Sequence, residues 1–131
     1  MSARALSILV ADDNVDAATT LGQLLALDGH RVDVAFDGEH ALRQAAEHRP
    51  DVAVLDLLMP RLGGCEVALR LREHNTPARP LLLIALSGST VDISRPCSDI
   101  DAYFTKPVDI LRLERYIREW GACLTGCCGC H

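Results

Sequence analysis

The sequence predicts a single α/β domain in which five parallel strands form a doubly wound sheet. Short apolar runs alternate with segments of helical periodicity, and this (βα)₅ order favours parallel strands joined by right-handed crossovers. The strand candidates are apolar on consecutive residues, as in "VAVLD" and "PLLLIALS", rather than on every second residue. Continuous apolar character indicates strands covered on both faces, as a parallel sheet requires. The length of 131 residues fits one domain with a sizeable core.

The strands and the first three helices follow from local signals. The strand candidates are about Ser7–Ala11, Arg31–Phe36, Asp51–Leu55, Leu81–Leu86 and Ala102–Thr105. Asn14 can cap a first helix that stops at Gly29, and Asp37 can cap a second helix that ends before Pro50. A third helix is expected over about Gly64–Glu73, where apolar residues recur with helical spacing.

The final helix and the crossover before it have very different signals. The final helix is predicted over about Asp109–Trp120, because its apolar residues form a stripe along one helix face. The members of this stripe are Ile110, Leu113, Ile117 and Trp120. The crossover Thr90–Asp101 has few strong helix formers and carries Pro96, which disrupts a helix interior. We therefore expect a shortened or irregular fourth helix.

Composition and charge exclude several classes of protein. The net charge is −5, whereas a general nucleic-acid binder needs a basic face. No apolar run reaches the length of about eighteen residues that a membrane span needs. The apolar run Leu6–Ala11 is too short for a signal peptide and is followed by acidic residues. We therefore expect a cytoplasmic protein that binds neither nucleic acid nor membranes.

Six cysteines are distributed unevenly along the chain. Cys65 and Cys97 stand alone, and the other four lie within the last nine residues, which end in His131. A disulfide framework spaces its cysteines across the fold, so we expect reduced thiols. Zn²⁺ is an alternative for the tail, but the spacing matches no structural zinc pattern, and a flexible end is preferred. The predicted organisation is one domain over residues 1–121 and a Cys-rich tail over residues 122–131.

Polar residues gather at one edge of the predicted sheet. The first strand is followed by Asp12 and Asp13, the third by Asp56, the fourth by Ser87 and the fifth by Lys106. The carboxyl ends of parallel strands meet at one edge, where ligands bind. Carboxylates so close together repel each other, and a divalent cation that prefers oxygen ligands compensates for this repulsion. An Asp nucleophile with a hydroxyl and a lysine beside Mg²⁺ suits phosphoryl transfer.

Each of these residues also has a purely structural interpretation. Asp12 and Asp13 can simply begin a helix, where the helix dipole favours acids. Ser87 with Gly88 can form a turn, and Lys106 by itself would be an ordinary surface lysine. Only the combination of these residues, which stand at the ends of four different strands, favours a common site.

Four segments together resemble the receiver domains of two-component response regulators. They are "ADD" at 11–13, "DVAVLDLLMPRLGG" at 51–64, "ALSG" at 85–88 and "YFTKP" at 103–107, and the resemblance covers roughly residues 6–120. It implies a flavodoxin-like fold with strand order 2-1-3-4-5. It also implies a signalling protein rather than an enzyme, phosphorylated by a histidine kinase or a histidine phosphotransfer protein. Stand-alone receivers and receivers at the end of hybrid sensor kinases are both similar to this chain.

The resemblance implies a role for each residue at the sheet edge. Asp56 matches the phosphoacceptor. Asp12 and Asp13 match the acids that bind Mg²⁺ or Mn²⁺, with Asp13 the more direct ligand, and Asp56 and the backbone carbonyl of Leu58 would complete the protein ligands. Lys106 matches the lysine that pairs with the phosphoryl group, and family members usually hold the bond to the following proline in the cis form.

The resemblance also implies a switch, with Ser87 as its hydroxyl and Tyr103 as its aromatic ring. Tyr103 by itself would be a half-buried packing residue. The spacing from Ser87 to Lys106 is shorter than is usual in receivers, so a receiver that docks without switching is an alternative. Leu58 is apolar where polar side chains help to orient an attacking water, so we expect a long-lived acyl phosphate.

Two other classes of protein use a similar sheet edge. A Mg²⁺-dependent phosphatase with an aspartyl phosphate intermediate would usually carry a second acid two residues beyond its nucleophile, where this chain has Leu58. A nucleotide or flavin binder would carry a Gly-rich phosphate loop after the first strand, where this chain has "ADDNVD". A phosphorylatable signalling receiver is therefore the predicted function.

Overall fold

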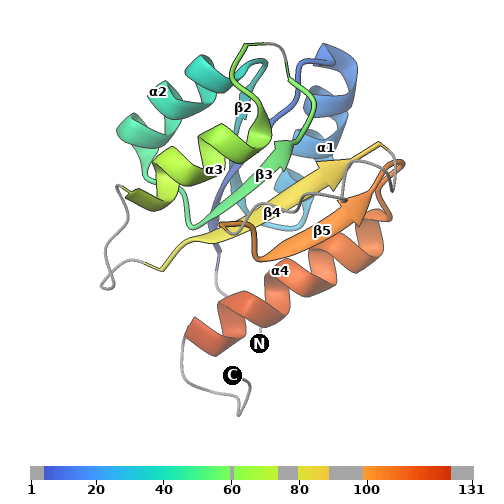
Figure 1. Cartoon of the computed structure of the whole chain (residues 1–131). Helices are drawn as coiled ribbons and strands as arrows, with labels where there is room; N and C mark the ends of the chain where they lie inside the picture. The colour runs from blue at the N-terminus through green and yellow to red at the C-terminus, as the bar shows by residue number, and fades with distance from the viewer. Residues whose placement is uncertain (1–4, 60, 74–79, 89–98, 125–131) are drawn as a thin grey trace.

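The computed structural model describes residues 5–59, 61–73, 80–88 and 99–124 (Figure 1). Five strands and four helices lie within these residues. The strands are β1 (Ser7–Ala11), β2 (Arg31–Ala35), β3 (Val52–Asp56), β4 (Leu82–Ser87) and β5 (Ala102–Thr105). The helices are α1 (Val15–Leu27), α2 (Gly38–His48), α3 (Gly64–Glu73) and α4 (Ile110–Leu124).

The five strands form one parallel sheet in the order β2-β1-β3-β4-β5, which confirms the predicted fold class. β1 pairs with both β2 and β3, so that Ala11 lies beside Ala35 on one side and Leu55 on the other. The carboxyl ends of β1 and β3 are therefore neighbours. β5 lies at one edge of the sheet, and β4 separates it from β3.

Helices cover both faces of the sheet, α1 and α4 on one face and α2 and α3 on the other (Figure 1). β3 shows why its sequence is apolar on consecutive residues. Val52 and Val54 point into the cluster under α1 and α4, whereas Ala53 and Leu55 point into the cluster under α2 and α3. Each side chain of the run is fully buried, so neither face can carry polar residues.

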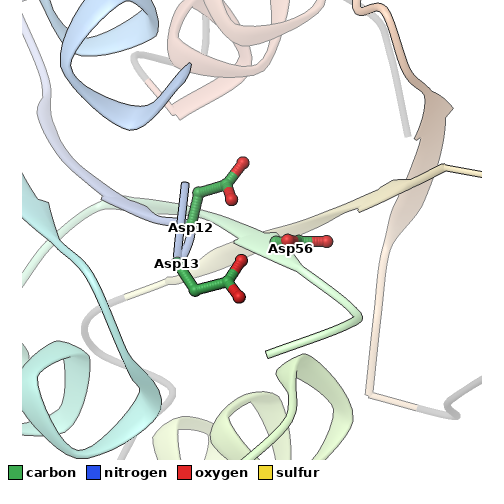
Figure 2. A group of neighbouring side chains, drawn as sticks. All are labelled: Asp12, Asp13 and Asp56. Atoms are coloured by element: carbon green, nitrogen blue, oxygen red, sulfur yellow. The ribbon is translucent and has the colours of Figure 1, made fainter. Parts of the chain in front are cut away.

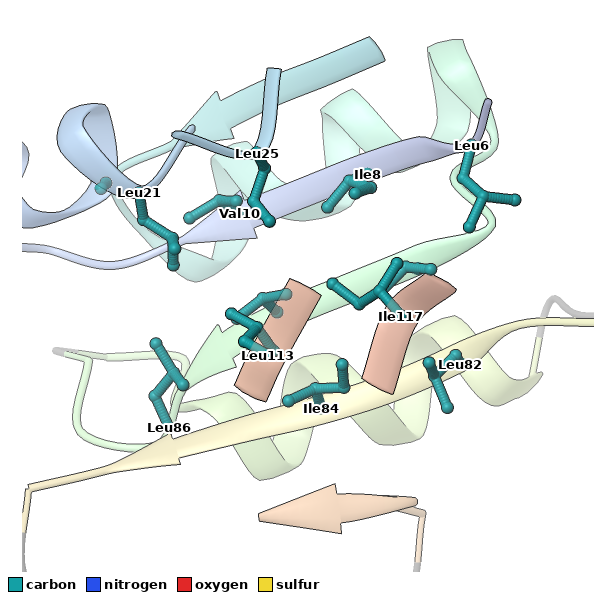
Figure 3. Close-up of a cluster of buried hydrophobic side chains, with 13 residues drawn as sticks. Leu6, Ile8, Val10, Leu21, Leu25, Leu82, Ile84, Leu86, Leu113 and Ile117 are labelled. Carbon is teal, nitrogen blue, oxygen red and sulfur yellow. The ribbon is translucent and has the colours of Figure 1, made fainter. Parts of the chain in front are cut away.

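Figure 3 shows the hydrophobic cluster beneath α1 and α4. Leu113 and Ile117 of α4 are fully buried there, and Ile110 and Trp120 are partly buried at its margin. The predicted stripe is therefore the inner face of α4. The helix continues beyond Trp120 to Leu124, further than its apolar stripe predicts, because helix ends are set by local backbone contacts as well as by periodicity.

The predicted helix boundaries are confirmed by side-chain caps. The Oδ1 atom of Asn14 accepts a hydrogen bond from the backbone N–H of Ala17 (3.0 Å) at the start of α1. Asp37 accepts one from His40 (2.7 Å) at the start of α2. Gly29, just after α1, has φ of 95°, a conformation that favours glycine. These contacts are local, which is why sequence patterns predict them well.

Two expectations fall wholly or mostly outside the described residues. One is the irregular fourth helix with Pro96. The other is the flexible character of the Cys-rich tail over residues 122–131, of which only residues 122–124 are described, as the end of α4. None of the described helices has both the length and the apolar character to cross a membrane.

The expectation of reduced thiols is wrong for two cysteines. Cys65, in the first turn of α3, and Cys123, in the last turn of α4, each take part in a disulfide. Pairing requires two sulfur atoms to approach in the folded chain, and the spacing of cysteines along the sequence does not report that distance.

Candidate functional site

Three acidic side chains meet at the carboxyl edge of the sheet (Figure 2). Asp12 and Asp13 directly follow β1, and Asp56 is the last residue of the neighbouring β3. One carboxylate oxygen of each lies within 4.8 Å of those of the other two. Asp12 and Asp56 are almost fully buried, at 2% and 5% exposure, whereas Asp13 is exposed. The strand order thus brings together the acids that the sequence separates by more than forty positions.

Lys106 reaches the same acids from β5 across the end of β4. Its Nζ atom lies 2.9 Å from the Oδ2 atom of Asp12 and 3.3 Å from the Oδ2 atom of Asp56. Its backbone N–H donates to the carbonyl oxygen of Ser87 (2.7 Å), which holds the two strand ends together. The peptide bond between Lys106 and Pro107 is cis, as the resemblance implies.

Burial has the largest influence on the pKa of the central acid. Burial raises the pKa of Asp56 above its ordinary value, and the nearby charge of Asp12 raises it further. The backbone N–H of Leu58, which donates to Asp56 Oδ1 (3.2 Å), and the charge of Lys106 both oppose this rise. A positive charge placed beside Asp56 would therefore favour its ionised form.

The lysine stays charged in this environment. Burial lowers the pKa of Lys106, but the hydrogen bond to Asp12 and the charges of Asp56 and Asp12 outweigh burial, so that the pKa is raised overall. Lys106 offsets only one of the three carboxylate charges in the cluster. The negative charge that remains on the cluster suits a divalent cation, which prefers oxygen ligands.

The three acids are engaged differently. Asp12 accepts a hydrogen bond from the backbone N–H of Asn14 (3.0 Å) on Oδ1 and pairs with Lys106 through Oδ2. Asp13 is the member of the cluster that is exposed to solvent. Leu58 is 62% exposed at the same rim. This arrangement fits a cation that keeps several waters and takes few protein ligands, as Mg²⁺ does.

Gly64 brings α3 against the end of β3, a contact that sequence reasoning missed. A Cβ atom at Gly64 would lie 2.6 Å from the backbone oxygen of Asp56, a distance that real Cβ atoms essentially never show. The start of α3 therefore approaches the acid only because residue 64 has no side chain. The pair "GG" at 63–64 was the available signal, since glycine permits a close approach of backbone that a side chain would block.

Ser87 lies on β4, the neighbour of β3, and Tyr103 lies on β5, the strand beyond β4. Ser87 is fully buried at the end of β4, and its register partner on β5 is Thr105. Tyr103 is half-buried. Its neighbour Phe104 packs with Tyr116 of α4 at a centroid distance of 5.9 Å, on the α1 and α4 face. Because successive strand residues point to opposite faces, Tyr103 points to the α2 and α3 side.

The comparison with protein families decides the identity of this fold and site. The model of the response regulator receiver domain matches residues 8–118. This chain belongs to the response regulator receiver family. The transcriptional regulatory protein TcrX of Mycobacterium tuberculosis is 35% identical over 88% of this chain, and MprA of Mycobacterium ulcerans is 36% identical over 85%. The receiver spans about half the length of these curated relatives, at 51% and 48%.

Solved receiver structures superpose along most of the chain. A CheY-like receiver domain from Methylobacillus flagellatus is 27% identical, with a TM-score of 0.80 over 88% of this chain and 98% of its own. The receiver domain of Ssk1 from Saccharomyces cerevisiae, solved with the histidine phosphotransfer protein Ypd1, is 25% identical, with a TM-score of 0.81 over 93% and 92%. The receiver thus has the CheY-like form of the flavodoxin-like fold.

Proposed function

We propose that this receiver takes a phosphoryl group on Asp56 from the phosphohistidine of a histidine kinase or a histidine phosphotransfer protein. The observation that carries the proposal is the position of Lys106, whose Nζ atom lies 3.3 Å from Asp56 inside the acidic cluster. In the transfer, a carboxylate oxygen of Asp56 bonds to phosphorus and the phosphorus–nitrogen bond to the histidine breaks. The imidazole leaves and takes a proton from water.

The surrounding residues prepare Asp56 for attack. A carboxyl group attacks only when ionised, and burial works against this form. The charge of Lys106 and the N–H of Leu58 favour the ionised form. The ammonium group of Lys106 is also placed to donate hydrogen bonds to the transferred phosphoryl oxygens.

The acidic cluster would hold Mg²⁺ or Mn²⁺. Asp13 would be the more direct ligand of the two acids after β1, and Asp12, Asp56 and the backbone carbonyl of Leu58 would complete the set. When bound, the cation would neutralise negative charge on the phosphoryl oxygens. The chemistry of the donors supports this assignment, because all are oxygen atoms and three come from carboxylates held close together.

The phosphorylated receiver would act by changing a protein-binding surface. Ser87 would move toward the phosphoryl group and Tyr103 would turn into the space left behind, which shifts an existing equilibrium. The receiver would promote only its own phosphorylation and dephosphorylation. Its downstream partner would be a protein in the cytoplasm rather than nucleic acid or a membrane.

The test is incubation with Mg²⁺ and acetyl phosphate, followed by intact mass measurement. A phosphoryl adduct is expected on the wild type and none on Asp56→Asn. Omission of the divalent cation should remove the adduct from the wild type. An adduct that persists in Asp56→Asn would refute the assigned phosphoacceptor. No adduct on either protein would favour a receiver-like docking module instead.

A further inference from the structure

Arg72 joins three segments at the amino-terminal edge of the sheet, opposite the acidic cluster. It lies in the last turn of α3, and its guanidinium donates three hydrogen bonds of 2.9 Å. One goes to the carbonyl oxygen of Leu81, one to the carbonyl oxygen of Asp99 and one to the carboxylate of Asp101. Arg72 thereby connects α3 to the residues just before β4 and just before β5.

Asp101 extends this connection into the sheet. Its backbone N–H donates to the carbonyl oxygen of Leu83 (2.8 Å), and its Oδ2 atom accepts from the N–H of Leu83 (2.8 Å). Both backbone groups of Leu83 are therefore bound by one residue. The next residue pair, Ile84 with Ala102, begins the β4–β5 register. The two hydrogen bonds between Asp101 and Leu83 therefore fix where this register starts.

β5 depends on these hydrogen bonds because its own sequence specifies its register weakly. The strand has four residues, lies at the sheet edge and contains no fully buried side chain. Register is strongly specified only where one face of a strand is buried. A slip of one residue would turn every side chain of β5 to the opposite face.

We infer that Arg72 and Asp101 are positioning residues for Lys106. The register that they fix places Thr105 beside Ser87, and this pairing precedes the hydrogen bond from the N–H of Lys106 to Ser87. Through that bond the lysine side chain is aimed at the acidic cluster. The inference rests on the proposed phosphorylation of Asp56, and it assigns a part in that reaction to two residues on the far edge of the sheet.

Energy considerations favour positioning over general stabilisation. The side chains of Arg72 and Asp101 are 31% and 41% exposed, and an ion pair this accessible to solvent contributes little to stability. Loss of the pair should therefore leave the domain folded. The planar guanidinium of Arg72 donates from two nitrogens in a fixed fork, whereas the ammonium group of a lysine has a single nitrogen and cannot reproduce these bonds. Arg72→Lys should accordingly fail to restore the function of Arg72.

The experiment measures the initial rate of phosphorylation by acetyl phosphate with Mg²⁺, at a temperature where circular dichroism shows every variant folded. Arg72→Met, Asp101→Ala and the milder Arg72→Lys should each be slower by about tenfold or more, since small misplacement of a reacting group is costly. Arg70→Met is the matched control. Arg70 lies on the same helix and pairs with Glu66 at 3.1 Å, away from β5.

A double-mutant cycle separates positioning from a merely structural role. If Asp101 acts through Lys106, then Asp101→Ala should cause no further loss of rate in a Lys106→Met background. A further loss of the same factor in that background would overturn the inference. Wild-type rates in both Arg72→Met and Asp101→Ala would also overturn it, while leaving the proposed function intact. A wild type that gains no adduct would refute the proposed function itself.

Discussion

The ammonium nitrogen of Lys106 lies 2.9 Å from a carboxylate oxygen of Asp12. This ion pair is shorter than the 3.3 Å contact of the same nitrogen with Asp56. Asp12 therefore holds Lys106 beside the proposed phosphoacceptor, which the same nitrogen also contacts.

Replacement of this lysine should be severe for function and mild for folding. We expect Lys106→Met to slow phosphorylation by acetyl phosphate by about a hundredfold or more, because a donor to the phosphoryl oxygens is lost. The pKa of Asp56 should also rise, since the charge of Lys106 lowers it. Phosphorylation is measured by intact mass, and the pKa by ¹³C NMR titration. An unchanged rate would contradict the assigned role.

Asp13→Ala should abolish Mg²⁺ binding and phosphorylation without unfolding the domain. Asp13 is exposed and lies among like charges, so its removal relieves repulsion while deleting the most accessible ligand. Isothermal titration calorimetry measures the binding, and thermal unfolding checks the fold. Asp16→Ala is the matched control, because Asp16 is an exposed acid in the first turn of α1. Equal loss of binding in both variants would point to nonspecific charge effects.

Leu58→Asn should shorten the lifetime of the phosphorylated receiver. Leu58 is 62% exposed two positions beyond Asp56, where an amide can orient an attacking water. We expect the decay to be faster by about tenfold or more. This factor is smaller than the rate enhancement that general acid–base catalysis typically supplies. Decay is followed by intact mass after removal of acetyl phosphate. Leu27→Asn is the control. Leu27 is 83% exposed and is the last residue of α1, so the phosphorylated form of this variant should decay like the wild type. Identical decay of Leu58→Asn and the wild type would count against the idea.

Asp37 should make the stability of the receiver depend on pH in the acidic range. Its hydrogen bond from the backbone of His40 lowers the pKa of Asp37 below the ordinary value. A lowered pKa contributes stability that is present above the unfolded-state pKa of about 4 and is lost as pH falls through the folded value. Asp37→Ala should lose about 1 kcal/mol at neutral pH, as for other helix caps.

Asp37→Asn is the control for this effect, because asparagine can cap the helix but carries no charge. Urea unfolding at neutral and acidic pH measures the free energy of unfolding. The difference between wild type and Asp37→Asn should shrink as pH falls. A difference that is independent of pH would mean that the charge of Asp37 contributes nothing.

Gly64→Ala should disturb both stability and phosphorylation. The added Cβ atom would meet the backbone oxygen of Asp56 at 2.6 Å, so the start of α3 must shift away. We expect a loss of about 1–3 kcal/mol, as for other overpacked positions. Thermal unfolding and the acetyl phosphate assay measure the two effects. Wild-type behaviour in both would show that the loop absorbs the methyl group.

Local features of this receiver were predictable from the sequence, and contacts between distant segments were not. Asn14 and Asp37 cap their helices as expected, because a cap depends on residues three positions apart. The bonds from Arg72 to Asp99 and Asp101 span 27 and 29 positions, and no sequence pattern marks them. The disulfides in which Cys65 and Cys123 take part also escaped prediction, because the spacing of cysteines along the sequence does not report the distance between their sulfur atoms.

The order of residues along the chain was enough to predict which of them stand at the ends of the strands. Central strands such as β3 and β4 are buried on both faces, as in a parallel sheet, and a parallel sheet delivers Asp12, Asp13, Asp56 and Lys106 to one edge. How these four residues divide their interactions could not be predicted in this way. Burial of Asp12 and Asp56, exposure of Asp13 and the reach of Lys106 across β4 depend on strand order and on register at the sheet edge. Those are set by packing between segments, which a pattern along one chain does not record.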